Sequence, residues 1–158
     1  MPVLISSCLL GIECRYDAYH SRDDEIIKKA QEIQFIPICP EQLGGLSTPR
    51  APSNIIKGDG KGVLFGHAQV INILGEDVTE AFIKGARESL KLARITGATK
   101  AILKNKSPSC GLNTPYCETD TGYGMGVTAA LLLSNGIKII EINPEEKNND
   151  IIERLQLL

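Results

Sequence analysis

The sequence predicts an α/β fold, Rossmann-like, in which a mostly parallel sheet of about four core strands carries helices on both faces. Short apolar runs alternate with amphipathic segments along the chain, which is typical of strand–helix units that build a parallel sheet. Several of these apolar runs end abruptly in Ser, Pro or Gly, as strands that lead into tight turns do. The length of 158 residues suits one domain with a real core, so we expect residues 1–158 to form a single unit.

The first part of the chain should contain two strands, one helix and a long loop. The apolar run 3–7 predicts the first strand, and 8–11 should form a turn or a first helical turn. Residues 23–34 begin with two aspartates and carry isoleucines at helical spacing, which predicts a helix. A second strand is expected at 36–38. The segment 41–55 is rich in Gly and Pro, so we expect a long ordered loop of the kind that is often functional.

A small β-hairpin is expected next. Three glycines within residues 58–62 predict a flexible tip. The apolar runs 63–65 and 69–74 follow it and are joined around Gly66-His67. Two short apolar runs separated by a Gly-containing turn indicate a hairpin, which we expect to lie against the core.

The second half of the chain should continue the alternation of helices and strands. Residues 77–96 have apolar side chains at helical spacing and are followed by Gly97, a residue that commonly ends a helix. The remaining predicted elements are a strand at 100–103, a helix at 126–134, a strand at 137–142 and a helix at 144–157.

Composition excludes several classes of protein. With 42% hydrophobic residues, 23% charged residues and a net charge of −2, the chain has no general attraction to nucleic acid or anionic membranes. No apolar run is long enough to span a bilayer, and the start resembles no signal peptide, so we expect a cytoplasmic protein. In that reducing compartment the five cysteines favour metal binding or catalysis over disulfides.

Three of the cysteines directly follow predicted core strands. Cys8, Cys39 and Cys110 each stand beside Ser, Pro or Gly at such a strand end. The carboxyl ends of the strands in an open α/β sheet share one edge, where ligands bind, so the three thiols should meet there. They could hold an iron–sulfur cluster, or zinc with a water as fourth ligand. Alternatively, they are small buried hydrophobes, and spacing alone does not separate these possibilities.

Two further residues are candidates for proton transfer. Glu41 lies two residues after Cys39 and could serve as a general acid or base, or could instead brace the turn at Gly44-Gly45. Ser107 precedes Cys110 in a Ser-Pro-Ser-Cys-Gly turn, where serines often serve the turn itself.

Four separated motifs stand out along the chain. In chain order they are Ser7-Cys8-Leu9-Leu10-Gly11 with Arg15-Tyr16-Asp17, Cys39-Pro40-Glu41 with Leu43-Gly44-Gly45 and Thr48-Pro49-Arg50, Ser107-Pro108-Ser109-Cys110-Gly111, and Gly126-Val127-Thr128-Ala129-Ala130. Together, over roughly residues 3 to 142, they resemble the thiouracil desulfurase family.

The resemblance implies an iron–sulfur-dependent desulfidase that removes sulfur from thiolated uracil, as base or nucleotide. The expected reaction is a non-redox hydrolysis that gives uracil and hydrogen sulfide. The implied cofactor is a 4Fe–4S cluster on Cys8, Cys39 and Cys110, with one iron not bound by protein. Glu41 and Ser107 would be the acid/base residues near that iron.

Three positions depart from the family pattern. Cys14 stands where many relatives carry an apolar residue and is interpreted as a spare thiol, Cys117 replaces a common acidic residue, and Asn54 replaces a common Glu. The alternative hypothesis is a non-catalytic iron–sulfur module that binds thiolated RNA or senses oxidants. Net charge −2 and 4% aromatic residues count against an RNA surface, so a small thiolated pyrimidine is the expected partner.

Overall fold

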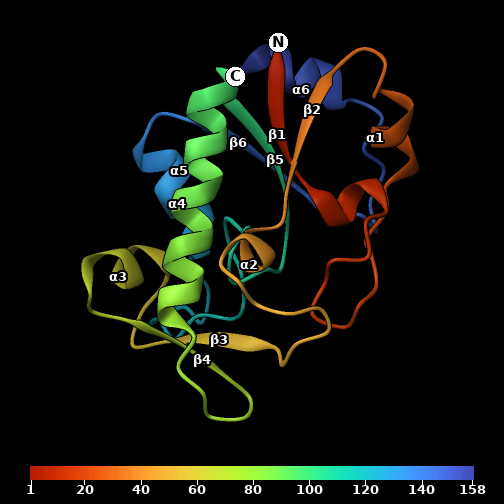
Figure 1. The fold of residues 1–158 in the computed structure, drawn as a ribbon. Coiled ribbons are helices and arrows are strands. Elements are labelled where there is room, and N and C mark those ends of the chain that lie inside the picture. Colours follow the sequence, from red (N-terminus) through yellow and green to blue (C-terminus); the bar gives the residue numbers. More distant parts are fainter.

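The computed structural model describes residues 1–158 and is built on a four-stranded parallel sheet in the order β2-β1-β5-β6 (Figure 1). All three neighbouring pairs of strands run parallel, so all four carboxyl ends lie at one edge of the sheet. The strands are β1 (Pro2–Ser6), β2 (Gln34–Ile38), β5 (Lys100–Lys104) and β6 (Lys138–Ile142). The predicted fold class is confirmed.

The two faces of the sheet are covered by different helices, because successive side chains of a strand point to opposite faces. Leu4, Ala101 and Leu103 pack in one cluster with α4 (Thr79–Thr96) and α5 (Val127–Ser134). The alternate residues of the strands, such as Ile5 and Ile102, pack in a second cluster on the other face. That face is covered by η1 (Ser7–Leu10), α1 (Asp24–Lys28) and α6 (Ile151–Leu157).

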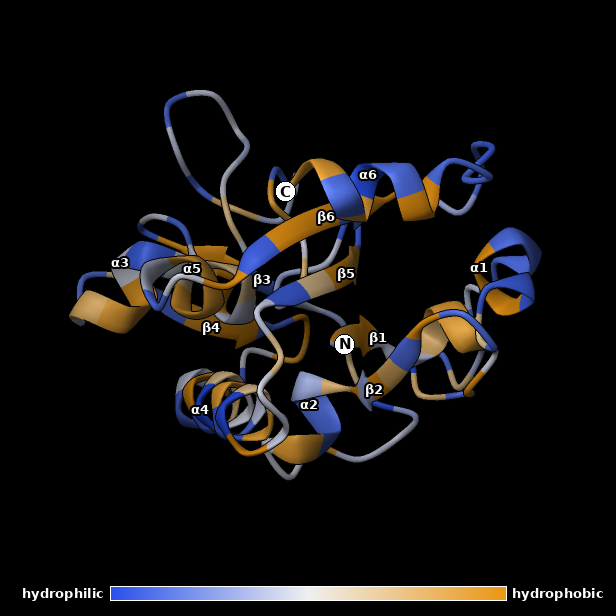
Figure 2. Ribbon diagram, turned by 90° about the horizontal axis from the view of Figure 1, so that it is seen from above, coloured by the Kyte–Doolittle hydropathy of each residue, from blue (hydrophilic) through white to orange (hydrophobic).

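Figure 2 shows α4 and α6 on opposite sides of the sheet, with apolar and polar residues alternating along α4. The longest helix is therefore amphipathic, with one side in the core and one in solvent. None of the helices combines the length and the apolar character that crossing a lipid bilayer requires.

A two-stranded antiparallel sheet lies beyond the carboxyl ends of the main strands (Figure 1). The predicted small antiparallel sheet is thus present, but the prediction of its first strand at residues 63–65 was wrong. Residues 63–65 belong to helix α3 (Gly60–Phe65), and β4 (Gln69–Asn72) pairs instead with β3 (Ser53–Ile56), a segment predicted to be loop.

Two features of the sequence explain this helix. The Asp59 carboxylate accepts hydrogen bonds from the backbone N–H groups of Lys61 and Gly62, which caps the helix start. Val63 is 2% exposed and Phe65 is 76% exposed. In a strand these two side chains would share one face, whereas in a helix they lie about 200° apart, which suits one buried and one exposed residue.

Three other boundaries differ from the predictions. Helix α1 ends at Lys28 instead of continuing to residue 34. Residues 29–33 form turns, in which the Ala30 N–H donates to the Ile27 carbonyl, before β2 begins at Gln34 and pairs with β1. Helix α6 begins at Ile151 rather than at residue 144, and Asn148 stabilises the preceding loop by donating to the carbonyls of Asn143 and Glu146. A short helix, α2 (Pro40–Leu43), also occupies the start of the predicted loop 41–55.

Candidate active site

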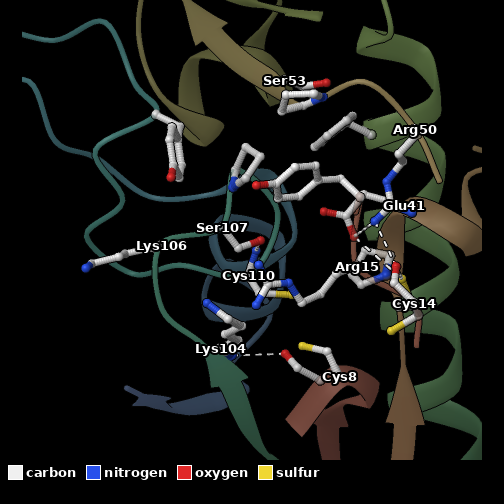
Figure 3. Close-up of a pocket in the computed structure, with 18 of the residues that line it drawn as sticks. Cys8, Cys14, Arg15, Glu41, Arg50, Ser53, Lys104, Lys106, Ser107 and Cys110 are labelled. Carbon is white, nitrogen blue, oxygen red and sulfur yellow. Dashed lines mark hydrogen bonds and ion pairs between the residues drawn. The ribbon is translucent and has the colours of Figure 1, made fainter. Parts of the chain in front are cut away.

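The three strand-end cysteines line one cavity of about 560 Å³ at the carboxyl edge of the sheet. Figure 3 labels Cys8 and Cys110 in this cavity. Cys8 lies in η1 directly after β1, Cys39 is the N-cap residue of α2 directly after β2, and Cys110 lies in the turn that follows β5. The parallel sheet therefore brings together thiols that are far apart in the sequence.

Helix α2, which carries Cys39 and Glu41, is held by a close crossing with α4. A methyl group on Gly85 of α4 would overlap the carbonyl of Pro40, and one on Gly44 would overlap the carbonyl of Ala81. The backbones meet without intervening side chains at both points. These two glycines fix the position of α2 at the cavity wall.

The turn that carries Cys110 is organised by Ser107. Its Oγ accepts hydrogen bonds from the backbone N–H groups of Ser109 (3.2 Å) and Cys110 (3.0 Å). These two bonds stabilise the turn that contains Ser107, which is the structural role considered for this serine from the sequence. The hydroxyl hydrogen of Ser107 is not used in these bonds, and Ser107 also lines the cavity.

Two of the strand-end thiols, Cys39 and Cys110, have a pKa raised above the ordinary value of a thiol. The pKa of the Cys110 thiol is raised chiefly by desolvation, and that of Cys39 by its hydrogen bond with Cys14 and then by desolvation. A metal that binds these thiols displaces their protons, so metal binding would release protons here.

The donor set suits a group larger than one metal ion. Nowhere in the chain do three His, Cys, Asp or Glu side chains gather closely enough to hold a single ion. The thiols of Cys8, Cys39 and Cys110 instead come from three separate elements around the cavity. Soft thiolates spread in this way fit an iron–sulfur cluster, whose irons each take a different ligand, better than a zinc ion.

Cys14 lies in the cavity wall, where sequence reasoning did not place it. It is 3% exposed, and its carbonyl oxygen is 3.6 Å from the Cys39 Sγ. The Cys39 thiol lowers the pKa of Cys14, but the Cys8 thiol and burial outweigh this effect and raise it to about 12. Cys14 follows no strand, and the fold of the loop after η1 is what brings it here.

Cys117 lies away from the cavity, beside the small antiparallel sheet. Its backbone forms an isolated parallel β-bridge with Ile55, and its Sγ is 3.8 Å from the carbonyl oxygen of Met125. Burial raises its pKa to about 11. This thiol is a buried part of the core, packed with Val70 and Phe82.

Glu41 contacts side chains from two other segments and the Cys39 thiol of its own segment. Its Oε1 accepts a hydrogen bond of 2.7 Å from the Ser109 hydroxyl, while its Oε2 lies 3.7 Å from Cys39 Sγ and 3.9 Å from an Arg50 Nη2. The side chains of Glu41 and Arg50 are only 13% and 11% exposed. The carboxylate makes no hydrogen bond to the Gly44-Gly45 turn. The alternative role considered from the sequence, in which Glu41 braces this turn, is therefore not seen.

Lys104 adds an unpaired positive charge to the cavity wall. Its Nζ donates to the backbone carbonyl of Asn105 at 3.0 Å, and no carboxylate lies within ion-pair distance. Desolvation lowers its pKa, against the opposing effect of the neighbouring Cys8 thiol. Tyr16 and Tyr116 also line the cavity and stay 45% and 41% exposed, so the opening is partly aromatic.

A family model for 2-thiouracil desulfurase matches residues 3–143. The chain belongs to this family. Its four cavity cysteines, Glu41 and Ser107 all fall within the matched residues, whereas α6 lies beyond them. The resemblance seen in the sequence motifs is thereby confirmed.

Two proteins illustrate the relationship. The uncharacterized protein YbbK of Bacillus subtilis (strain 168) is 46% identical over 153 residues, which cover 95% of this chain and 99% of YbbK. The solved structure of the [4Fe-4S]-dependent thiouracil desulfidase TudS matches with a TM-score of 0.78 and 31% identity, covering 99% of both chains.

Proposed function

We propose that this protein is a desulfidase that replaces the sulfur of a thiolated uracil, as base or nucleotide, with oxygen from water. The products are the uracil and hydrogen sulfide, so the carbon keeps its oxidation state and no external reductant is needed. The observation that carries the proposal is the cavity that three strand-end cysteines share with a largely buried glutamate, Glu41. Family membership and the likeness to TudS support it.

Cys8, Cys39 and Cys110 are the residues that would hold a 4Fe–4S cluster, with one iron left without a protein ligand. When bound, the cluster supplies a thiophilic Lewis acid for the sulfur of the substrate. Lys104 places its ammonium group on the same wall, where it would offset the negative charge of the thiolates. The half-exposed Tyr16 and Tyr116 rings would contact the pyrimidine.

Glu41 and Ser107 would move the protons of the reaction. Glu41 takes a proton from the water that attacks the ring carbon, since its carboxylate lines the cavity and is oriented by neighbouring donors. Ser107 uses its oxygen to accept two backbone N–H groups, so its hydroxyl hydrogen can be donated to the ring nitrogen. As the sulfur leaves, it takes the proton held by Glu41 and the hydrogen of the added hydroxyl, whose oxygen becomes the carbonyl oxygen of uracil. The ring nitrogen then returns its proton to Ser107.

Glu41→Gln tests this assignment, because glutamine keeps the size of the side chain but cannot take a proton. Anaerobically reconstituted protein should convert thiouracil to uracil. The reaction is measured by the loss of thiocarbonyl absorbance and by chromatography of the product. We expect Glu41→Gln to lower kcat about 100-fold or more with unchanged iron content. Glu80→Gln is the control, since Glu80 also lies in the first turn of a helix but is exposed on α4.

Two results would contradict the proposal in different ways. Normal turnover by the Glu41→Gln protein would remove Glu41 from the mechanism and leave Ser107 as the candidate. If the fully iron-loaded wild-type protein converts neither thiouracil nor its monophosphate, the enzyme assignment fails and the non-catalytic iron–sulfur module is favoured.

A further inference from the structure

The two serines of the Ser-Pro-Ser-Cys-Gly turn make different contacts. Ser107 accepts hydrogen bonds from backbone N–H groups inside the turn. Ser109 instead donates its hydroxyl hydrogen out of the turn, to Oε1 of Glu41 at 2.7 Å. Ser109 is 1% exposed, so water does not compete freely for this bond. The contact joins the segment after β5 to the segment after β2, across 68 positions of the sequence.

The two oxygens of the Glu41 carboxylate are not equivalent. The bond to Oε1 has the length of a strong hydrogen bond between a hydroxyl and a carboxylate. The contacts of Oε2, with Cys39 Sγ at 3.7 Å and with Arg50 at 3.9 Å, are longer and weaker. A single strong donor on Oε1 fixes the rotation of the carboxylate and leaves Oε2 as the oxygen that can take another proton.

Ser109 is itself held rigidly. Its backbone N–H donates to Ser107 Oγ, and its carbonyl accepts the N–H of Ala129 in the first turn of α5 at 3.0 Å. A side chain on Gly126 would overlap the Ser109 carbonyl, so the turn and the helix start are in direct backbone contact. The Ser109 hydroxyl therefore acts from a fixed point of the fold rather than from a mobile loop.

We propose that Ser109 is a positioning residue for Glu41, orienting its carboxylate so that Oε2 accepts the proton of the attacking water. This inference rests on the proposed function and assigns to Ser109 a role separate from that of Ser107. Ser109 acts through Glu41 and does not itself exchange a proton with the substrate.

Ser109→Ala, Glu41→Gln and the double variant test the proposal on iron-loaded protein. Losing a hydrogen bond to a charged group should lower kcat about 10- to 100-fold for Ser109→Ala, with KM changed about twofold or less. In the Glu41→Gln background, Ser109→Ala should lower kcat by about threefold or less, because residue 41 can no longer act as a base. Ser89→Ala is the matched control: Ser89 is also buried and donates a 2.8 Å hydrogen bond, but to the Gly85 carbonyl within α4.

Infrared spectroscopy provides a readout that does not depend on turnover. The carboxylate stretching band of Glu41 is the band that disappears in Glu41→Gln, and it can be measured before and after cluster reconstitution. We expect Ser109→Ala to shift this band and Ser89→Ala to leave it in place. The shift is expected even if Ser109→Ala binds less iron, because the hydrogen bond exists within the protein chain itself.

The proposal is overturned if Ser109→Ala keeps wild-type kcat, if its loss is equally large in the Glu41→Gln background, or if the Glu41 band does not move. Absent turnover in the wild-type protein would overturn the proposed function instead. In that case the infrared band would still decide whether Ser109 holds Glu41.

Discussion

Cys14 and Cys117 differ from the three strand-end cysteines in how the chain presents them. Cys117 is enclosed by apolar side chains of the small sheet and α4, and burial gives it a pKa of about 11. Cys14 contacts Cys39 through its backbone carbonyl, which also accepts a 3.0 Å hydrogen bond from Arg50. Its contribution to the wall therefore includes a backbone group that survives removal of the thiol.

Replacing each cysteine with serine separates these roles. Cys8→Ser, Cys39→Ser and Cys110→Ser should each lose most of the roughly four irons and four sulfides per chain, since a hydroxyl is a poor ligand for this cluster. Cys14→Ser and Cys117→Ser should keep them. Iron and acid-labile sulfide are measured after anaerobic reconstitution, with visible absorption as a check.

Cys117→Ser is the control for the general effect of losing a buried thiol. If Cys14→Ser loses the iron while Cys8→Ser retains it, the ligand assignment is wrong, and Cys14 takes the place of Cys8 in the ligand set.

At the scale of elements, the crossing of α2 and α4 connects the fold to the site. Helix α2 has only four residues, too few to be stable alone, so its position depends on its packing against α4. Gly44 and Gly85 permit that packing because neither places a side chain between the two backbones. Cys39 and Glu41 at the start of α2 are located through this contact.

Gly85→Ala should therefore destabilise the protein, although alanine favours a helix by about 1 kcal/mol over glycine. Because the new methyl group meets the Pro40 carbonyl, we expect the free energy of unfolding to fall by about 2–3 kcal/mol. The displaced α2 should also lower turnover. Denaturant titration of Gly85→Ala and of Lys84→Ala, an exposed neighbour, measures the effect. An unchanged midpoint in Gly85→Ala would show that α2 can move away at no cost.

At the scale of the whole molecule, the site and much of the stabilising core lie apart. The cavity is at the carboxyl edge of the sheet, whereas α6 covers one face near the two chain termini (Figure 1). Ile151 and Leu155 of α6 are buried against the strands, although α6 lies beyond the residues that the family model matches. A buried bond of 2.7 Å from Asn148 to Asp23 also ties the segment before α6 to the start of α1.

Ile151→Ala should lower stability without impairing the site. Ile151 is fully buried, so we expect the free energy of unfolding to fall by about 2–5 kcal/mol while iron content and kcat of the folded protein stay unchanged. Leu157→Ala, in the same helix but 86% exposed, should change stability by about 0.5 kcal/mol or less. A fall in kcat of the folded Ile151→Ala protein would show that α6 influences the cavity.

Sequence patterns alone predicted the four strands of the main sheet, the presence of α1, α4, α5 and α6, and the strand-end cysteines, but neither α2 nor α3. These features depend on local patterns: short apolar runs for the strands, apolar residues at helical spacing for the helices, and Ser, Pro or Gly where a strand ends. Because parallel strands share one carboxyl edge, the approach of Cys8, Cys39 and Cys110 also followed from those patterns. The family motifs then supplied the roles proposed for Glu41 and Ser107.

Contacts between distant groups became visible in the folded chain. The pairing of β3 with β4, the place of Cys14 in the cavity wall and the bond from Ser109 to Glu41 all join segments that no local pattern connects. The same holds for the ends of α1 and α6, where strand pairing and the Asn148 contacts override helical spacing. Local periodicity sets which face of an element is buried, whereas contacts between elements depend on how whole elements pack together.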